Sequence, residues 1–449
     1  MNIAVVGGGW AGLSAAVRLR QYGCSVVVFE AARTLGGRAR RVSSATLNTR
    51  IDNGQHILLG AYTETLALMQ ELGLNVPDLF LRERLQLHSA DGSFSLRAGA
   101  LPAPLHLLGA ILGARGLGLM ERLRIIAITT RLRRHGWKVD GGMTVAQWLA
   151  QGRQSPRAIQ LFWQPLCLAA LNTPMDAACA RLFARVLQDS LGGPGHASDV
   201  LIPRVDLSQL WPDQVAQYRP DGTPGELAVR PGCAVRKLQA WSSHVNVDGS
   251  RFDAVVVAGN APATHRLLQQ LDPCESGIDY LSTLSAFQYL PIATLTLQLE
   301  RPWNRVHPML LLKDFPERMQ YGQWLFDRSA SGPADSQCLL NIVISDARAF
   351  MEHSRAKVIA ATIDQVREQS EREADMPGVR NHEVIIEKRA TFAAVPGLRR
   401  PSNSTPWPRI WVAGDWTDTG YPAVLEGAVR SGKEAAHAIY RTLGSRLAQ

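Results

Sequence analysis

The first thirty residues change from one hydrophobic period to another. Asn2 to Val6 is a short apolar run that ends at Gly7-Gly8-Gly9. Apolar residues then recur at helical spacing as far as Tyr22-Gly23, where a glycine can end a helix. A second β-branched run begins at Ser25 and ends in Glu30. Strand, glycine turn, helix and strand in this order predict the opening βαβ unit of a nucleotide-binding sheet.

Two later stretches repeat the strand-like pattern. Residues 233–260 contain a run that turns at Asp248-Gly249 toward the apolar residues 254–257. Residues 409–413 form a third strand, and a helical pattern follows over 423–443. We therefore predict one discontinuous, Rossmann-like nucleotide-binding domain, formed by residues 1–61, 201–284 and 386–449.

The intervening residues have a different pattern. Residues 62–200 are mostly helical in their spacing, with a predicted hairpin at 85–97, whereas residues 285–345 alternate as strands do. Residues 353–372 are predicted to be an exposed helix. We assign residues 62–200 and 285–385 to an inserted substrate domain of mixed helix and sheet. The expected fold class is α/β, and α+β overall.

Composition narrows the function without deciding it. The 449 residues carry a formal net charge of +9, which suits nucleic acid, an anionic membrane or phosphorylated substrates. The six cysteines are scattered singly, so no metal site and no disulfide framework are expected. No signal-peptide pattern precedes the first strand, and the longest uncharged stretch, from Ala98, is short for a membrane span. We expect a cytoplasmic protein or one attached to the inner face of a membrane.

The glycine motif Gly7-x-Gly9-x-x-Gly12 fits the phosphates of a dinucleotide. Gly7 permits the tight turn, Gly9 lets backbone approach a pyrophosphate, and Gly12 lets helix and strand pack closely. Glu30, at the end of the second strand, can accept hydrogen bonds from an adenosine ribose. The alternative is a glycine-rich turn that binds nothing, but the flanking strand, helix and acid favour a nucleotide.

Two further motifs point to FAD. Leu35-Gly36-Gly37-Arg38 follows the acid closely, and its arginine can neutralise pyrophosphate charge, while Asp52-Asn53-Gly54 follows after an exposed connection. Together with the C-terminal segments 413–415 and 422–428, they resemble the amine oxidase and phytoene desaturase superfamily of flavoproteins. The resemblance implies a noncovalent FAD. The residues predicted to bind it are Gly7, Gly9, Gly12, Glu30, Gly37, Arg38, Gly54, Val235, Gly414, Asp415, Val424 and Leu425.

Within that superfamily the chain is most similar to the hydroxysqualene dehydroxylases of hopanoid biosynthesis. The matching stretches are residues 52–60, 162–173, 203–207, 388–392 and 414–420. The resemblance implies reductive removal of a hydroxyl from a long apolar isoprenoid to give squalene. The alternatives are a carotenoid-type desaturase and a non-catalytic isoprenoid escort; an amine oxidase is disfavoured because no aromatic cage is evident. No second dinucleotide motif follows a predicted strand, so NADPH docking transiently at the flavin, or another carrier, remains open as the electron donor.

The group that protonates the leaving hydroxyl is the least defined part of the site. His56 follows the Asp-x-Gly loop and is our catalytic candidate, although a histidine bonded to backbone is an equal alternative. Asp189 and Asp418 are further candidates, with capping or a surface turn as the competing role. Substrate-lining candidates, weighed against an ordinary place in the core, are Trp163, Phe392 and Trp416.

Residues 98–138 combine apolar side chains with clustered cations. Glu121 is the single acid between Arg115 and Lys138. Such a segment suits the surface of an anionic membrane, and the alternative is an amphipathic helix packed on its own domain with a solvated basic face. A nucleic-acid partner is disfavoured because no recognition motif is present.

Overall fold

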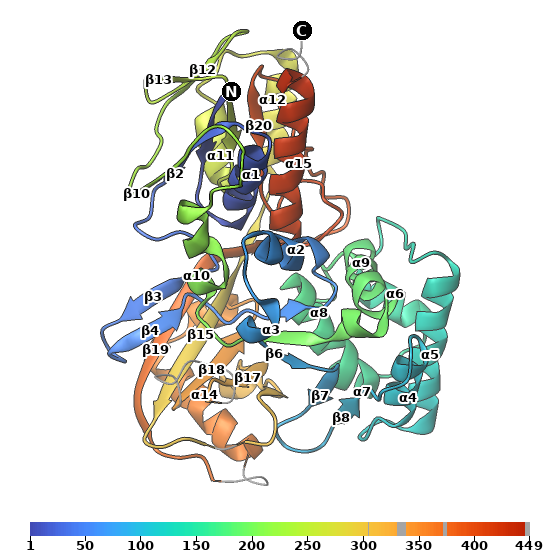
Figure 1. Ribbon diagram of the computed structural model, residues 1–449. Helices are drawn as coiled ribbons and strands as arrows, with labels where there is room; N and C mark the ends of the chain where they lie inside the picture. Colours follow the sequence, from blue (N-terminus) through green and yellow to red (C-terminus); the bar gives the residue numbers. More distant parts are fainter. Residues whose placement is uncertain (304, 330–337, 371–374, 445–449) are drawn as a thin grey trace.

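A parallel sheet forms one end of the molecule in the computed structural model, which describes residues 1–303, 305–329, 338–370 and 375–444 (Figure 1). Its strand order is β10-β2-β1-β14-β20, and neighbouring strands run parallel. The first strand and the last described helix both lie at this end. The five strands are β1 (Asn2–Val6), β2 (Ser25–Glu30), β10 (Leu227–Pro231), β14 (Ala254–Val257) and β20 (Ile410–Val412).

Each face of this sheet is covered, which explains its continuous apolar strands. On β1, Ile3 and Val5 pack in the same cluster as helices α1 (Trp10–Gln21) and α15 (Leu425–Leu443). Ala4 and Val6 point to the opposite face, which α11 (Ala261–Leu268) and α12 (Glu275–Ser285) cover together with the small sheet β11 (Leu238–Ala240), β12 (Val245–Val247) and β13 (Ser250–Phe252). Strands buried on both faces are typical of parallel sheets between helices.

The two ends of the chain meet where α1 and α15 pack side by side (Figure 1). A Cβ added to Gly432 of α15 would lie 2.1 Å from the Ala11 carbonyl oxygen of α1. The helices therefore approach backbone to backbone, and Ser14 of α1 donates a hydrogen bond to the Val429 carbonyl at 2.9 Å. This contact fixes the C-terminal helix against the first βαβ unit.

The second sheet is antiparallel, in the order β16-β17-β18-β15-β19. One face packs against α14 (Arg355–Ser370), whose Val358, Ile359 and Val366 are buried with the leucines of the sheet. The helix predicted as exposed is thus half-buried, because its apolar stripe covers the sheet. The strands are β15 (Tyr289–Leu299), β16 (Met309–Leu311), β17 (Trp324–Asp327), β18 (Leu339–Ile344) and β19 (Val379–Phe392).

A helical region packs beside this sheet (Figure 1). Short strands connect the larger elements: β5 (Leu58–Leu59), β6 (Phe80–Glu83), β7 (Gln86–His88), β8 (Ser95–Arg97) and β9 (Val200–Pro203). A separate hairpin of β3 (Arg41–Ser44) and β4 (Thr49–Asp52) packs against the antiparallel sheet. Its helices are α2 (Thr63–Glu71), α3 (Val76–Leu79), α4 (Leu105–Leu112), α5 (Leu119–Arg134), α6 (Val145–Gln151), α7 (Pro156–Ala158), α8 (Gln164–Leu171) and α9 (Ala180–Leu191). Residues Ile159–Trp163 form a π-helical turn before Pro165, which lacks the N–H of a regular turn.

The predicted fold class is confirmed: a Rossmann-like parallel sheet stands beside an antiparallel substrate-domain sheet. The hairpin predicted at 85–97 is the β7–β8 pair. The domain boundaries stay a prediction; that at residue 386 falls inside β19. Among the described residues, we find no helix with the length and apolarity needed to cross a bilayer.

Replacing Gly432 by alanine tests the contact between the chain ends. The added methyl group meets the Ala11 carbonyl, so we expect Gly432→Ala to lower the free energy of unfolding by about 1–3 kcal/mol. The matched control is Gly195→Ala, because a Cβ at Gly195 meets nothing within 4 Å. Urea unfolding followed by circular dichroism measures both variants. Equal stability of the two would contradict the packing described.

Candidate functional site

The two glycine motifs lie against each other at the end of β1. The Gly36 amide donates to the Gly8 carbonyl at 2.8 Å, and Gly9 forms a parallel bridge with Gly36. A Cβ on Gly12 would lie 1.9 Å from the Gly7 carbonyl oxygen, and one on Gly37 would lie 3.0 Å from the Gly9 Cα. Side chains are therefore excluded here by backbone, and the loops form one cradle.

Gly9 differs from its neighbours because the space beside it is open. Its backbone is extended, with φ −77° and ψ 175°, and an added Cβ would meet the Gly37 Cα at 3.8 Å as its nearest neighbour. Gly9 is also the N-cap of α1 and makes no side-chain cap hydrogen bond. Open space before the positive end of a helix dipole fits a pyrophosphate.

Glu30 is held at the end of β2 by backbone amides. Its Oε2 accepts from the Gly8 amide at 2.6 Å and its Oε1 from the Ala32 amide at 2.7 Å. The Cys233 amide donates to the Glu30 carbonyl at 2.8 Å, so the segment that carries Val235 runs beside this strand end. Each carboxylate oxygen keeps a further lone pair, as ribose binding requires.

An ion pair links the second glycine motif to the C-terminal loop. Arg38 Nη2 lies 2.7 Å from Asp415 Oδ1, and Nη1 donates to the Ala390 carbonyl of β19 at 2.6 Å. Asp415 is buried, whereas the Arg38 side chain is 32% exposed. Burial opposes the positive charge, but the neighbouring carboxylate outweighs it and raises the pKa of Arg38. Its role toward pyrophosphate stays a prediction, since Asp415 already offsets part of its charge.

Arg400 stabilises the C-terminal loop by hydrogen bonds to its carbonyl groups. Our sequence reasoning did not identify this residue. It donates to the carbonyls of Asp415 at 2.9 Å, Trp416 at 3.2 Å and Tyr421 at 2.5 Å, and also to the Thr417 carbonyl. Burial lowers the pKa of Arg400 to about 10. Nothing in the local pattern signals this role, because all four acceptors lie at least fifteen residues away in sequence.

The N-terminus of α15 adjoins this loop. Val424 is its N-cap and makes no side-chain cap hydrogen bond, and Leu425 is the first helical residue. Glu426 is fully buried and accepts from the Thr65 amide at 3.0 Å and the Thr65 hydroxyl at 2.7 Å, at the start of α2. The first turn of α15 is thus anchored to α2 while its own amides keep capacity for a ligand.

These features fit FAD. The open space at Gly9 suits the pyrophosphate, Glu30 suits the adenosine ribose, and α1 and α15 each begin without a side-chain cap. Reduced flavin gathers negative charge at its pyrimidine, which a helix N-terminus such as that of α15 stabilises.

The loop from Asp52 to His56 is tied to the polar face of the second sheet. The Gln55 amide donates to Thr294 Oγ1 at 3.4 Å, and Asn341 Nδ2 donates to Gln55 Oε1 at 2.8 Å. Thr296 in turn donates to Asn341 Oδ1 at 2.9 Å. Sequence reasoning missed these residues, although polar positions alternating with leucines on β15 were a visible signal.

His56 lies on that loop and bonds to backbone. Its Nδ1 lies 2.9 Å from the Gly54 carbonyl oxygen. Burial lowers the pKa of His56, and the charge of Arg38 lowers it further, against the opposing effect of the Gly54 bond. The neutral ring with Nδ1 protonated is favoured at pH 7, which leaves Nε2 as an acceptor. Its role as proton donor stays a prediction.

The three predicted substrate-lining aromatics are completely buried. Trp163 donates to Gln154 Oε1 and Trp416 to the Gly259 carbonyl, each at 2.9 Å. Phe392 packs edge-on against Phe287. These contacts favour a place in the core, and a lining role stays a prediction. The two other candidate proton donors have local surroundings that match their competing roles. Asp418 lies on an exposed turn, and Asp189 forms an ion pair with Arg185.

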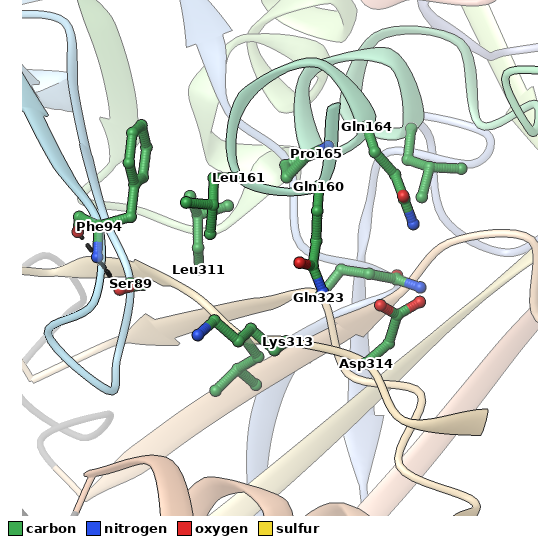
Figure 2. Close-up of a pocket in the computed structure, with 12 residues that line it drawn as sticks. Ser89, Phe94, Gln160, Leu161, Gln164, Pro165, Leu311, Lys313, Asp314 and Gln323 are labelled. Atoms are coloured by element: carbon green, nitrogen blue, oxygen red, sulfur yellow. Dashed lines mark hydrogen bonds between the residues drawn. The ribbon is translucent and has the colours of Figure 1, made fainter. Parts of the chain in front are cut away.

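Two adjoining hollows lie between the helical region and the antiparallel sheet. Figure 2 shows the smaller one, where side chains of residues 160–168 stand opposite the chain that carries residues 311–314. The larger one has a volume of about 430 Å³ and shares Gln164, Leu168, Asp314 and Gln323 with it. Neither is lined by a residue predicted to bind the cofactor, so both stand apart from the cradle.

Comparison with known proteins identifies relatives of this chain. The family model described as flavin-containing amine oxidoreductase matches residues 10–440. A hydroxysqualene dehydroxylase from Rhodopseudomonas palustris is 30% identical, with 97% of each chain covered. A zeta-carotene desaturase from Synechocystis is 24% identical, over 98% of this chain and 97% of its own. Among solved structures, an oxidoreductase from Methanosarcina mazei superposes with a TM-score of 0.72 at 16% identity, covering 98% of this chain and all of its own.

The predicted pyrophosphate site at Gly9 can be tested by filling the open space beside it. A Cβ at Gly9 meets no protein atom closer than van der Waals contact, so we expect Gly9→Leu to fold normally and, with its side chain in the open space, to retain no flavin. The control is Gly12→Leu, whose side chain would enter the Gly7 carbonyl and should disrupt the fold as well. Visible absorbance reports flavin, and far-ultraviolet circular dichroism reports folding. Full flavin content in folded Gly9→Leu would refute the assignment of the pyrophosphate site to Gly9.

Asp52, on β4, gives a pH prediction. Burial raises the pKa of Asp52 from 3.8 to about 6, despite nearby Arg328 and a hydrogen bond from the Leu207 amide. Between these two values the folded state binds more protons than the unfolded state, so the contribution of Asp52 to stability falls as pH rises from about 4 to about 6. Asp52→Asn should remove that slope. Unfolding midpoints of both proteins across this range measure it, and parallel pH profiles would refute the pKa assignment.

Proposed function

The chain belongs to the family of flavin-containing amine oxidoreductases, and from that premise we propose that it reduces hydroxysqualene to squalene in a FAD-dependent reaction. The family implies the flavin. The observation that carries the substrate is the full-length similarity to a hydroxysqualene dehydroxylase. Squalene and hopanoid biosynthesis is the corresponding pathway, and the substrate is a long apolar isoprenoid.

The reaction is balanced by one hydride and one proton. FAD, when bound and reduced, supplies hydride-transfer chemistry. The allylic C–O bond of the alcohol breaks, a C–H bond forms at that carbon, and the hydroxyl takes a proton and leaves as water. NADPH or another two-electron carrier restores the reducing equivalents.

The residues of the chain have three tasks in this proposal. The Gly9–Gly37 cradle and Glu30 position the cofactor, and the Arg38–Asp415 pair joins the two loops beside it. The start of α15 stabilises negative charge on a flavin ring. His56 delivers the proton to the leaving hydroxyl from its protonated form.

The aromatic ring of Tyr421, on the C-terminal loop held by Arg400, is unsuited to binding a substrate ammonium. The guanidinium of Arg185 lies 4.6 Å from the centre of this ring and that of Arg430 lies 5.2 Å from it. A substrate ammonium at this ring would meet two cations already in place. A non-catalytic escort is also disfavoured, because the complete cofactor cradle would then have no use.

A carotenoid-type desaturase is the second candidate, supported by the full-length similarity to a zeta-carotene desaturase. It would use the same cofactor in the oxidising direction. Two anaerobic incubations separate the candidates: reduced protein with hydroxysqualene and oxidised protein with phytoene, each analysed by mass spectrometry. We expect squalene in the first and unchanged phytoene in the second. Desaturated phytoene without squalene formation would overturn the proposal.

The proton-donor role of His56 predicts a pH profile. Because its pKa lies below 6.5, the protonated fraction grows as pH falls, so kcat should rise below pH 6.5. His56→Gln should lower kcat by about 10²–10⁴-fold, leave KM unchanged and remove this rise. His196→Gln, on an exposed side chain, is the control. A His56→Gln enzyme that keeps the wild-type pH profile would assign His56 a purely structural role.

A further inference from the structure

An apolar surface stands uncovered on the helical region. Twelve large hydrophobic side chains are exposed among the described residues, and seven of them fall between residues 101 and 123. Leu119 is 66% exposed and Met120 60%. We call this set the docking face; its members are Leu101, Leu105, Leu108, Leu112, Leu119, Met120 and Leu123. Such a concentration of exposed apolar area indicates a partner.

Helix α4 is apolar both on the side that packs in the core and on the side that faces solvent. Its inner side buries Leu107, Ala110 and Ile111 in the hydrophobic core. Its outer side carries Leu105, Leu108 and Leu112, which are spaced as one helical stripe and exposed. The hydrophobic core of the protein covers the inner apolar side of α4. The outer apolar side therefore requires a second apolar environment.

The corner between α4 and α5 is rigidly held. Arg122 donates to the Leu112 carbonyl at 2.7 Å and to the Leu117 carbonyl at 2.9 Å, which joins the end of α4 to the start of α5. Glu121 accepts from the Gly118 amide and from the Ser155 hydroxyl. The docking face is therefore formed before any partner binds, which reduces the entropic cost of binding.

The charged residues around the docking face indicate the kind of partner that it binds. Arg97, Arg115 and Arg124 are exposed, and β8, which carries Arg97, packs against α4. Glu121 is the single acidic residue from Ala98 to Arg124, and its carboxylate already accepts from Gly118 and Ser155. Two copies of the chain joined through this face would bring cations against cations. Anionic headgroups above an acyl layer match both the apolar centre and the positive border.

We propose that the docking face attaches the protein reversibly to the surface of an anionic phospholipid bilayer. Leucines and Met120 enter the acyl boundary, and the bordering arginines bind lipid phosphates. The inference does not rest on the proposed substrate, but it gives an insoluble isoprenoid a route that avoids water.

The structure narrows the segment expected from the sequence. Arg131, Arg133 and Arg134 lie toward the far end of α5, and Arg131 is about 16 Å along the helix from Met120. That separation is about two screening lengths at physiological salt, so these three cations contribute less than Arg97, Arg115 and Arg124. The docking face thus ends near Leu123, well short of residue 138.

The first test removes apolar contact. Leu105→Gln, Leu112→Gln and Leu119→Gln together should weaken binding to phosphatidylcholine–phosphatidylglycerol vesicles by at least about tenfold in cosedimentation. Ile278→Gln with Val306→Gln, two exposed apolar residues elsewhere, is the control and should bind as the wild type does. Flavin absorbance and turnover in detergent should be unchanged in both. Wild-type affinity in the leucine variant overturns the proposal.

The second test separates the two groups of arginines. Changing Arg97, Arg115 and Arg124 to glutamine should reduce binding to the anionic vesicles by about tenfold, whereas the same change at Arg131, Arg133 and Arg134 should have a smaller effect. Binding should also weaken as salt is raised. Equal binding to pure phosphatidylcholine vesicles, or no difference between the two triple variants, contradicts the assigned face.

A site-specific probe gives an independent readout. With the exposed Cys233 and Cys274 replaced by serine, a fluorophore on Met120→Cys should be quenched by brominated lipids, and one on Val306→Cys should not. Light scattering without lipid tests the competing partner, a second copy of the chain. A wild-type dimer that the leucine variant dissociates, together with an unquenched probe at residue 120, would overturn the proposal. Loss of squalene formation with intact vesicle binding would contradict the proposed function alone.

Discussion

The architecture depends on backbone packing directly against backbone at three points. Gly12 lies against the Gly7 carbonyl, Gly37 against Gly9, and Gly432 against Ala11. The first two contacts form the cradle beside β1, and the third fixes the C-terminal helix to the first one. Because no side chain stands between these segments, parts of the chain more than four hundred residues apart lie side by side at the predicted cofactor site.

Polar contacts then join this site to the rest of the molecule. Arg38 bonds both to Asp415 and to a carbonyl of β19, and Gln55 bonds to Asn341 of the antiparallel sheet. Glu426 places its carboxylate on the start of α2. The contacts of Gln55 and Glu426 reach the two segments of the predicted substrate domain, so they set its position relative to the parallel sheet.

Local patterns were sufficient for the predicted cradle and the fold class. The run from Asn2 to Glu30 carries its own strand, turn and helix signals, and it folds as expected. Arg400 and Asn341 were missed because their partners come from distant segments, which hydrophobic periodicity does not report. Helix α14 was predicted as exposed because its apolar stripe is interrupted by polar residues, and only the facing sheet shows what it buries.

We propose that both ends of the chain form a site for one complete FAD. Heating purified protein and identifying the released flavin by chromatography tests it most directly, because FAD has the adenosine ribose that Glu30 is predicted to bind and FMN does not. We predict FAD, at about one molecule per chain. Release of FMN, or a colourless protein that takes up no FAD, would contradict the claim.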